Sequence, residues 1–274
     1  MGLTELKLIF SAVVFAGGAI GVLLPWTLER GPYRERFMAL GDTFAGGILG
    51  GAGLVHLLSS GAAEFRTAAP GLGYPLAYAL AGAGFLLILL IEAVIVASPD
   101  PGESPLHCTS RGASHEIGPD TGAAGPRAMA FVLLLVLSVH SIIVGTALGA
   151  QSSSAEAYII FAAIMAHKSM AGFALGVSYR RSGSSLRRGA PVAAVFASMT
   201  PIGILAGTAV EAWVPTASRR LFEAVFDSVG AGTFLYIATL DIIRTEFELP
   251  GDRWQKWLLA AAGFAVMAVI ALWI

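Results

Sequence analysis

The sequence predicts an all-α polytopic membrane protein in which eight transmembrane helices form a single domain over residues 1–274. Only 13% of the 274 residues are charged and 56% are hydrophobic, whereas about 25% of the residues in a typical soluble domain are charged. The mean hydropathy of +0.75 agrees with a chain solvated by lipid. Runs such as residues 85–91 are apolar without interruption, which favours helices over the strict alternation of a membrane β-barrel.

Eight apolar stretches are each long enough to cross a bilayer, which takes about 20 mostly apolar residues in a helix. We expect the spans at residues 3–28, 39–60, 73–97, 128–150, 156–179, 189–213, 223–243 and 254–274. The chain has 33 glycines, which suit close packing between such helices. Its single cysteine cannot form an intramolecular disulfide, so the fold must depend on packing.

The distribution of basic residues between the spans predicts the orientation, because cytoplasmic connections are rich in Lys and Arg. The first, third, fifth and seventh connections and their borders carry most of these residues: Arg30, Arg34, Arg36, Arg111, Arg127, Arg180, Arg181, Arg187, Arg188, Arg244, Arg253 and Lys256. We therefore expect both termini outside the cytoplasm, in the plasma membrane or alternatively in an organelle membrane. The net charge of −1 does not indicate a nucleic-acid partner.

The third connection, residues 98–127, is the only long one, and its prolines and glycines predict a flexible cytoplasmic loop. It contains His107, Cys108 and His115, whose nitrogen and sulfur ligands suit transient capture of a transition metal. The spacing of these three residues is loose for a metal site. The alternative, scattered polar residues in a linker, therefore stays open.

The fourth and fifth spans contain the same motif, H-x-x-x-x-G-x-A-L-G, beginning at His140 and at His167. Adjacent helices with a short connection run antiparallel, so this duplication indicates an inverted-repeat-like core of the kind found in transporters. We expect the motif glycines to bring the two helices together, so that both histidines face the same interior space. Two imidazoles can share a divalent ion there. The alternative is that each histidine hydrogen-bonds to a neighbouring helix.

At these residues the sequence resembles the ZIP family of metal transporters, whose fourth and fifth helices contain similar histidine motifs. The resemblance extends over essentially the whole chain. It includes residues 44–58 in the second span, 87–92 in the third, 200–204 in the sixth with its Pro-Ile-Gly stretch, and 232–247 in the seventh.

The resemblance implies transport of a divalent ion, zinc or alternatively iron or manganese, toward the cytoplasm. It makes His140 and His167 ligands of the transported ion and places Ser141 beside them. Its expected partners are the metal ion and the lipid bilayer, with no other cofactor; a homodimer is left open. Hydrolase motifs such as H-E-x-x-H and G-x-S-x-G are missing from the sequence, so an enzyme is not expected. A non-transporting metal sensor or a degenerate family member is the alternative.

The sequence departs from the family at three positions. Many relatives have glutamates where this chain has Val144 and Ala171, and some have an acid in place of Thr200. These replacements argue against a two-metal centre. Lys168 follows His167 at a position where relatives with a second metal place a ligand, so we expect its ammonium to substitute for that metal, paired with Asp241, Glu92 or Asp42. The alternative is that Lys168 extends to the membrane interface.

The remaining polar residues of the spans are candidates for a relay along the transport path, because buried carboxylates are costly in a membrane unless paired. We expect His56 and Glu64 at the outer mouth, as an entrance for the ion. Asp241 and Glu246 are expected on the cytoplasmic side, as an exit. Asp42 and Glu92 lie within the second and third spans.

Overall fold

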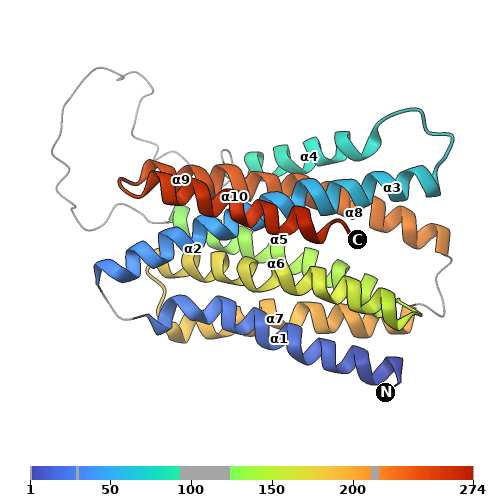
Figure 1. The fold of residues 1–274 in the computed structure, drawn as a ribbon, viewed down its shortest axis with the longest axis horizontal. Helices are drawn as coiled ribbons and strands as arrows, with labels where there is room; N and C mark the ends of the chain where they lie inside the picture. The colour runs from blue at the N-terminus through green and yellow to red at the C-terminus, as the bar shows by residue number, and fades with distance from the viewer. Residues whose placement is uncertain (1, 29–30, 93–123, 211–215, 274) are drawn as a thin grey trace.

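The computed structural model describes residues 2–28, 31–92, 124–210 and 216–273 (Figure 1), and every regular element in these ranges is helical. Two of the elements, η1 and η3, are π-helical. The elements are α1 (Leu3–Thr27), α2 (Pro32–Gly51), η1 (Ala52–Leu57), α3 (Leu58–Ala68), α4 (Leu76–Leu90), α5 (Ala124–Gly149), α6 (Ser154–Arg181), α7 (Leu186–Val210), α8 (Thr216–Tyr236), η3 (Ile237–Ile243), α9 (Arg244–Glu248) and α10 (Arg253–Ile270).

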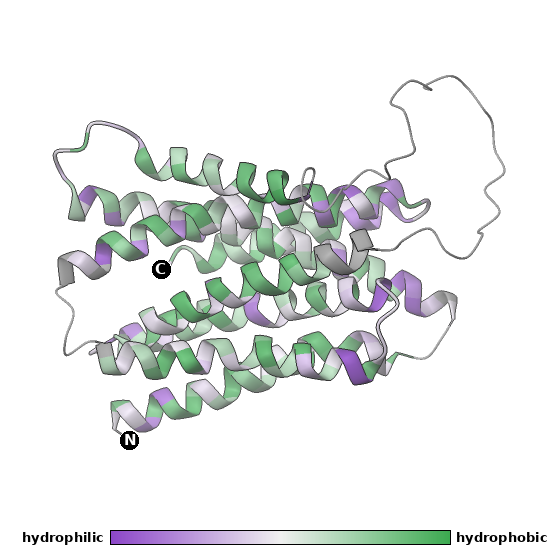
Figure 2. Ribbon diagram, turned by 180° about the vertical axis from the view of Figure 1, so that it is seen from behind, coloured by the Kyte–Doolittle hydropathy of each residue, from purple (hydrophilic) through white to green (hydrophobic). Residues whose placement is uncertain are grey.

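Six helices in the described ranges are long and apolar enough to cross a membrane, by length and composition. They are Leu3–Thr27, Tyr33–Ala68, Ala130–Gly149, Ser154–Arg181, Leu186–Ala209 and Arg220–Glu248. α4 is a shorter apolar helix. The protein is therefore an all-helical, multi-pass membrane protein. In Figure 2, apolar residues cover most of the middle of the bundle, and strongly hydrophilic residues concentrate toward its ends.

Two helices are longer than their apolar stretches indicated. The second span was expected at 39–60, but its helix runs from Pro32 through η1 to Ala68. The seventh was expected at 223–243, but its helix begins at Thr216 and continues through η3 and α9 to Glu248. Hydropathy identifies only the part of a helix that is apolar, and these helices continue into polar sequence at both ends.

The expected loop at 98–127 ends earlier than predicted, because α5 begins at Ala124 and residues 124–127 are helical. The three residues proposed for metal capture there, His107, Cys108 and His115, lie outside the described residues. Figure 1 places the beginning of α1 and the end of α10 toward the same end of the bundle, with the ends of α6 and α9 at the opposite end.

The helices form two bundles, and within each bundle glycines allow close contact between helix backbones. In the first bundle, α1 packs on α6 and on α7, and α5 packs on α7. In the second, α10 packs on α2, and α8 packs on α3 and α4. A Cβ added at Gly47 of α2 would lie 2.1 Å from the Ala260 carbonyl oxygen of α10, and one at Gly232 of α8 would lie 1.8 Å from the Ala81 oxygen of α4. At these contacts only glycine lets the backbones meet.

The motif glycines do not join α5 to α6, as the sequence had suggested. Gly149 of α5 lies against the Ile204 carbonyl of α7, where a Cβ would be 2.1 Å from the oxygen. Gly176 of α6 lies against the Val22 carbonyl of α1, at 2.2 Å for the same comparison. The motif glycines thus pack α5 against α7 and α6 against α1, all within the first bundle. Sequence spacing shows that glycines share a helix face but not which helix covers that face.

Candidate metal centre

Three histidines from three helices lie next to one another inside the protein. The ring centroids of His140 on α5 and His167 on α6 are 5.7 Å apart. His56, on η1, has its ring centroid 6.2 Å from that of His167. His140 and His167 face the same interior space, as their duplicated motif predicted. His56, expected at the outer mouth, lies beside the central pair and also lines the larger cavity described below.

Each of these histidines has a buried ring nitrogen without a hydrogen-bond partner: Nδ1 of His56, Nε2 of His140 and Nδ1 of His167. Buried polar atoms are normally satisfied, so three unpaired nitrogens in one place require an explanation. At a zinc–nitrogen distance of about 2.0 Å and a tetrahedral angle, two imidazoles on one zinc ion have centroids roughly 5 Å apart. The observed separations exceed this value slightly. In the described part of the chain no three His, Cys, Asp or Glu side chains are close enough to form a metal site as they stand.

A small cavity of about 10 Å³ lies between these helices, lined by His140, His167 and Lys168. A volume of roughly 10–15 Å³ holds one water molecule. Val144, Ala171 and Thr200 also line it. The three positions at which the family resemblance implies acids therefore all face this space, and in this chain they contribute no carboxylate to it.

Lys168 is held at the cavity by neutral partners. Its ammonium donates hydrogen bonds to the Ser141 hydroxyl at 2.8 Å and to the Phe196 carbonyl at 2.9 Å. It also lies 3.6 Å from the centroid of the Phe196 ring, in a cation–π contact. Lys168 is only 3% exposed, so it does not extend to the interface. None of the three expected acids, Asp241, Glu92 and Asp42, forms an ion pair with Lys168, whose contacts in the described part of the chain are the hydroxyl, the carbonyl and the ring. Asp42 instead pairs with Arg181, and Glu92 accepts a hydrogen bond from Tyr236.

A larger cavity of about 420 Å³, which we call the outer vestibule, lies on the side of the chain termini. His56 and Val144 line it, and Val144 also lines the small central cavity. The vestibule thus extends to the histidine site. Its polar lining includes four carboxylates and one arginine: Glu64, Glu156, Glu223, Asp227 and Arg220. Glu64 was predicted at this mouth; the other three acids were not identified from the sequence.

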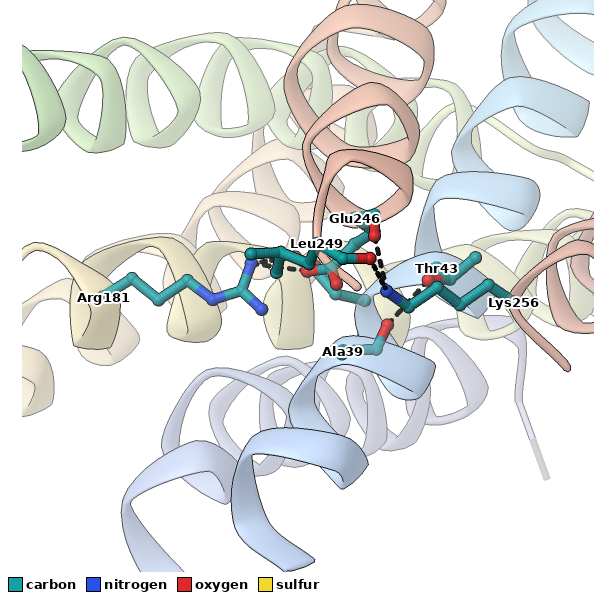
Figure 3. Close-up of polar contacts among 7 residues, drawn as sticks. Ala39, Thr43, Arg181, Glu246, Leu249 and Lys256 are labelled. Atoms are coloured by element: carbon teal, nitrogen blue, oxygen red, sulfur yellow. Dashed lines mark hydrogen bonds and ion pairs between the residues drawn. The ribbon is translucent and has the colours of Figure 1, made fainter. Parts of the chain in front are cut away.

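The opposite end of the bundle contains a buried ion cluster, shown in part in Figure 3. Arg181, at the end of α6, lies 2.5 Å from a carboxylate oxygen of Glu246 on α9 and 3.4 Å from one of Asp42 on α2. The Lys256 ammonium donates to the Glu246 backbone carbonyl at 2.5 Å and to that of Leu249 at 3.2 Å. Asp42 and Glu246, two of the predicted relay residues, therefore lie together around one guanidinium.

The other two predicted relay residues form no ion pair with Arg181 in the described part of the chain, but Asp241 is near enough to interact electrostatically with Asp42 and Arg181. Glu92, just beyond α4, accepts a hydrogen bond from the Tyr236 hydroxyl at the end of α8. Asp241 belongs to the π-helical segment η3 and is partly buried.

Sequence reasoning did not recognise Phe196, Phe234 and Arg181 as part of this arrangement. Phe196 supports Lys168, and the Phe234 ring has its centroid 4.5 Å from that of His140. Aromatic residues in apolar spans carry no signal that separates a site wall from ordinary core. His56 was expected at the mouth, which it does line, but its closeness to His167 was not predicted. It lies on a π-helical segment, and π-helical turns often occur at functional sites.

Comparisons with known proteins indicate one family. A family profile described as ZIP Zinc transporter matches residues 97–271. Human Zinc transporter ZIP2 is 34% identical over 144 residues, which cover 53% of this chain and 47% of that protein. Mouse Zinc transporter ZIP2 is 29% identical over 88% of this chain and 87% of its own length. Bovine Zinc transporter ZIP1 is 32% identical over 87% of this chain and 79% of its own.

The profile covers both histidine motifs, which begin at His140 and His167. The resemblance inferred from those motifs is therefore confirmed, as is the expectation of a transporter rather than an enzyme. The chain belongs to the ZIP family of zinc transporters.

Proposed function

We propose that the protein carries divalent metal ions, zinc in the first place, across the membrane into the cytoplasm through a site formed by His140, His167 and His56. The observation that supports this most is the convergence of three buried, unpartnered imidazole nitrogens from η1, α5 and α6. Neutral imidazole is a ligand that zinc favours. Small rotations of the three rings would bring their nitrogens toward one ion, with water completing a labile coordination shell.

The vestibule supports an outer entrance to this site. It contains more acids than bases and ends at His56 and Val144, so it would concentrate cations beside the histidines. Arginines of the described connections, among them Arg36 and Arg181, lie at the opposite end, which we take as cytoplasmic by the positive-inside rule. On this reading both termini are extracytoplasmic and Asp42, Glu246, Asp241 and Glu92 serve the exit. Residence in the plasma membrane, rather than in an organelle, is part of the same proposal.

We further propose that the chain crosses the membrane eight times, adding α4 and α10 to the six spans described above. α10 has 18 residues, about 27 Å of helix, which is close to the thickness of the hydrocarbon core. α5 and α6 would form the centre of an inverted repeat. The same motif positions bind α5 to α7 and α6 to α1, as expected for two copies of one packing arrangement.

In this proposal Ser141 and Lys168 serve the site without binding the ion directly. Ser141 donates to the Leu137 carbonyl and accepts from Lys168, so its hydroxyl holds the ammonium in place. The fixed positive charge would take the place of a second metal, since Val144, Ala171 and Thr200 supply no carboxylates. One transported ion per cycle follows from this arrangement.

Zinc uptake into proteoliposomes that contain only this protein tests the function. A transporter accumulates radioactive zinc against a protein-free control, whereas a metal sensor or a degenerate family member binds zinc without accumulation. Competition by iron and manganese in the same assay decides which ion is preferred. Absence of accumulation, with zinc still bound to the purified protein, would replace transport with sensing.

A further inference from the structure

Arg181 connects the two helical bundles at the predicted cytoplasmic end. It lies at the end of α6, in the first bundle, and its carboxylate partners Asp42 and Glu246 lie on α2 and α9, in the second. Figure 3 shows Arg181 and Glu246. Other ion pairs at this end stay within the second bundle: Arg36 with Asp252 and Arg244 with Glu248. The pairs of Arg181 therefore depend on how the bundles sit relative to each other.

The two carboxylates around Arg181 are deeply buried. The Glu246 side chain is 0% exposed and that of Asp42 is 7% exposed. Oδ1 of Asp42 is buried and has no hydrogen-bond partner. Two carboxylates in such surroundings need a cation, since a buried charge without a partner is strongly destabilising. In this arrangement the cation is a side chain of the protein itself.

We propose that Arg181 is a tethered cation that occupies the Asp42–Glu246 pair and keeps the cytoplasmic end of the path closed. Its pairs form when the outer vestibule is open, and they break when the bundles shift to open the inner end. Asp42 and Glu246 are then free to receive the departing metal ion. This inference rests on the proposed transport function, and it adds an active role for a residue that does not contact the histidine site.

A cysteine reporter on α2 tests the inference. Met38 of α2 packs against Phe173 and Val177 of α6. Ala45 follows Asp42 by three residues, so Ala45 and Asp42 lie on the same face of α2. Ala45 is 0% exposed and lies deeper than Asp42, since α2 begins at the inner end. In a Cys108→Ser background, Ala45→Cys should react slowly with an impermeant maleimide added to the cytoplasmic face.

Arg181→Gln should raise the rate of this labelling about tenfold. The substitution removes ion pairs that exist only in the inner-closed state, so it shifts the equilibrium toward the inner-open state. A second reporter, Ser60→Cys in the outer vestibule, should become less reactive from the outside in the same variant. Opposite changes at the two ends distinguish a shift between states from general loosening. Arg244→Gln, which removes a pair within one bundle, is the matched control and should change neither rate.

The inference would be overturned if each reporter is labelled at the same rate in Arg181→Gln as in the parent. It would also be overturned if Arg181→Gln raises the labelling rate of both reporters. If Arg181→Gln does not fold, Glu246→Gln removes the shorter of the two pairs and should shift both reporters in the same directions. All labelling is carried out without metal. The two proposals can fail separately. If the parent does not accumulate zinc but Arg181→Gln still changes the two labelling rates in opposite directions, the transport function is disproved and the role of Arg181 as a tethered cation is retained.

Discussion

The Lys168 ammonium on α6 donates a 2.8 Å hydrogen bond to the Ser141 hydroxyl on α5. Each of these two residues directly follows a motif histidine in the sequence, Lys168 after His167 and Ser141 after His140. The contact makes the positive charge a fixed part of the proposed metal site. It also shows that a buried lysine in a membrane can be accommodated by a hydroxyl, a carbonyl and an aromatic ring, without an acidic partner.

Replacing His140 or His167 with alanine should lower zinc affinity at least about tenfold, which corresponds to about 1.4 kcal/mol of binding free energy. His56→Ala should raise the half-saturation concentration by a smaller factor, because His56 is the outermost of the three. Zinc uptake into proteoliposomes, normalised to reconstituted protein, measures these effects.

The control for these variants is the double substitution His107→Ala and His115→Ala, the only other histidines in the chain. It should leave the half-saturation concentration for external zinc unchanged if the loop only buffers or senses the ion after crossing. Wild-type uptake in both His140→Ala and His167→Ala would remove the histidine site from the proposal.

Substitution of Lys168 should change how many ions the protein binds. Lys168→Asp removes the fixed charge and adds a carboxylate, so bound zinc should rise from one toward two ions per chain. Lys168→Gln should alter the preference among zinc, iron and manganese. Equilibrium dialysis followed by metal analysis gives both quantities.

Ser141→Ala separates the charge of Lys168 from its support. It keeps the ammonium but removes one acceptor, so the number of bound ions should remain one while stability falls by roughly 1–3 kcal/mol. Wild-type stoichiometry and selectivity in both Lys168 variants would show that the lysine has only a structural role.

The duplicated motif was sufficient to predict which two histidines would meet, because a repeat in antiparallel neighbours places equivalent residues at the same depth. It was not sufficient to predict their surroundings. His56 joins them from a π-helical segment, and the change in helical period there is not visible in residue types. Lys168 was expected beside an acid because charge alone was considered; the Phe196 carbonyl that it contacts carries no sequence signal at all.

The apolar spans were predicted well where hydropathy is uniform, as in α1, and less well where helices have polar ends, as in α2 with α3. The partner of each glycine could not be predicted. Hydropathy describes one helix against lipid, whereas a glycine contact is a property of two helices, and its partner is fixed only when all the helices pack together.

The acidic vestibule predicts that the electrostatic attraction of zinc to the entrance depends on ionic strength. Glu64→Gln or Glu156→Gln should raise the half-saturation concentration for zinc about two- to fivefold at low ionic strength, because each removes negative charge from the mouth. The difference should shrink in high salt as the Debye length falls from about 30 Å at 0.01 M to about 3 Å at 1 M. Glu248→Gln, at the opposite end, is the control. An effect of equal size at both salt concentrations would contradict long-range attraction and indicate direct coordination.

The contact between α4 and α8 predicts a sharp difference between two glycines. A Cβ at Gly232 would lie 1.8 Å from the Ala81 carbonyl oxygen and 2.7 Å from the Phe85 nitrogen, and backbone cannot move aside as a side chain can. Gly232→Ala should therefore cost about 1–3 kcal/mol, as overpacking does, and lower the unfolding midpoint by roughly 2–4 °C per kcal/mol. Gly82, on α4, has open space where a Cβ would be added, so Gly82→Ala should hold or raise the midpoint, because alanine favours helix by about 1 kcal/mol. Thermal unfolding in detergent compares the two variants, and equal midpoints would mean that α4 and α8 do not pack as closely as described.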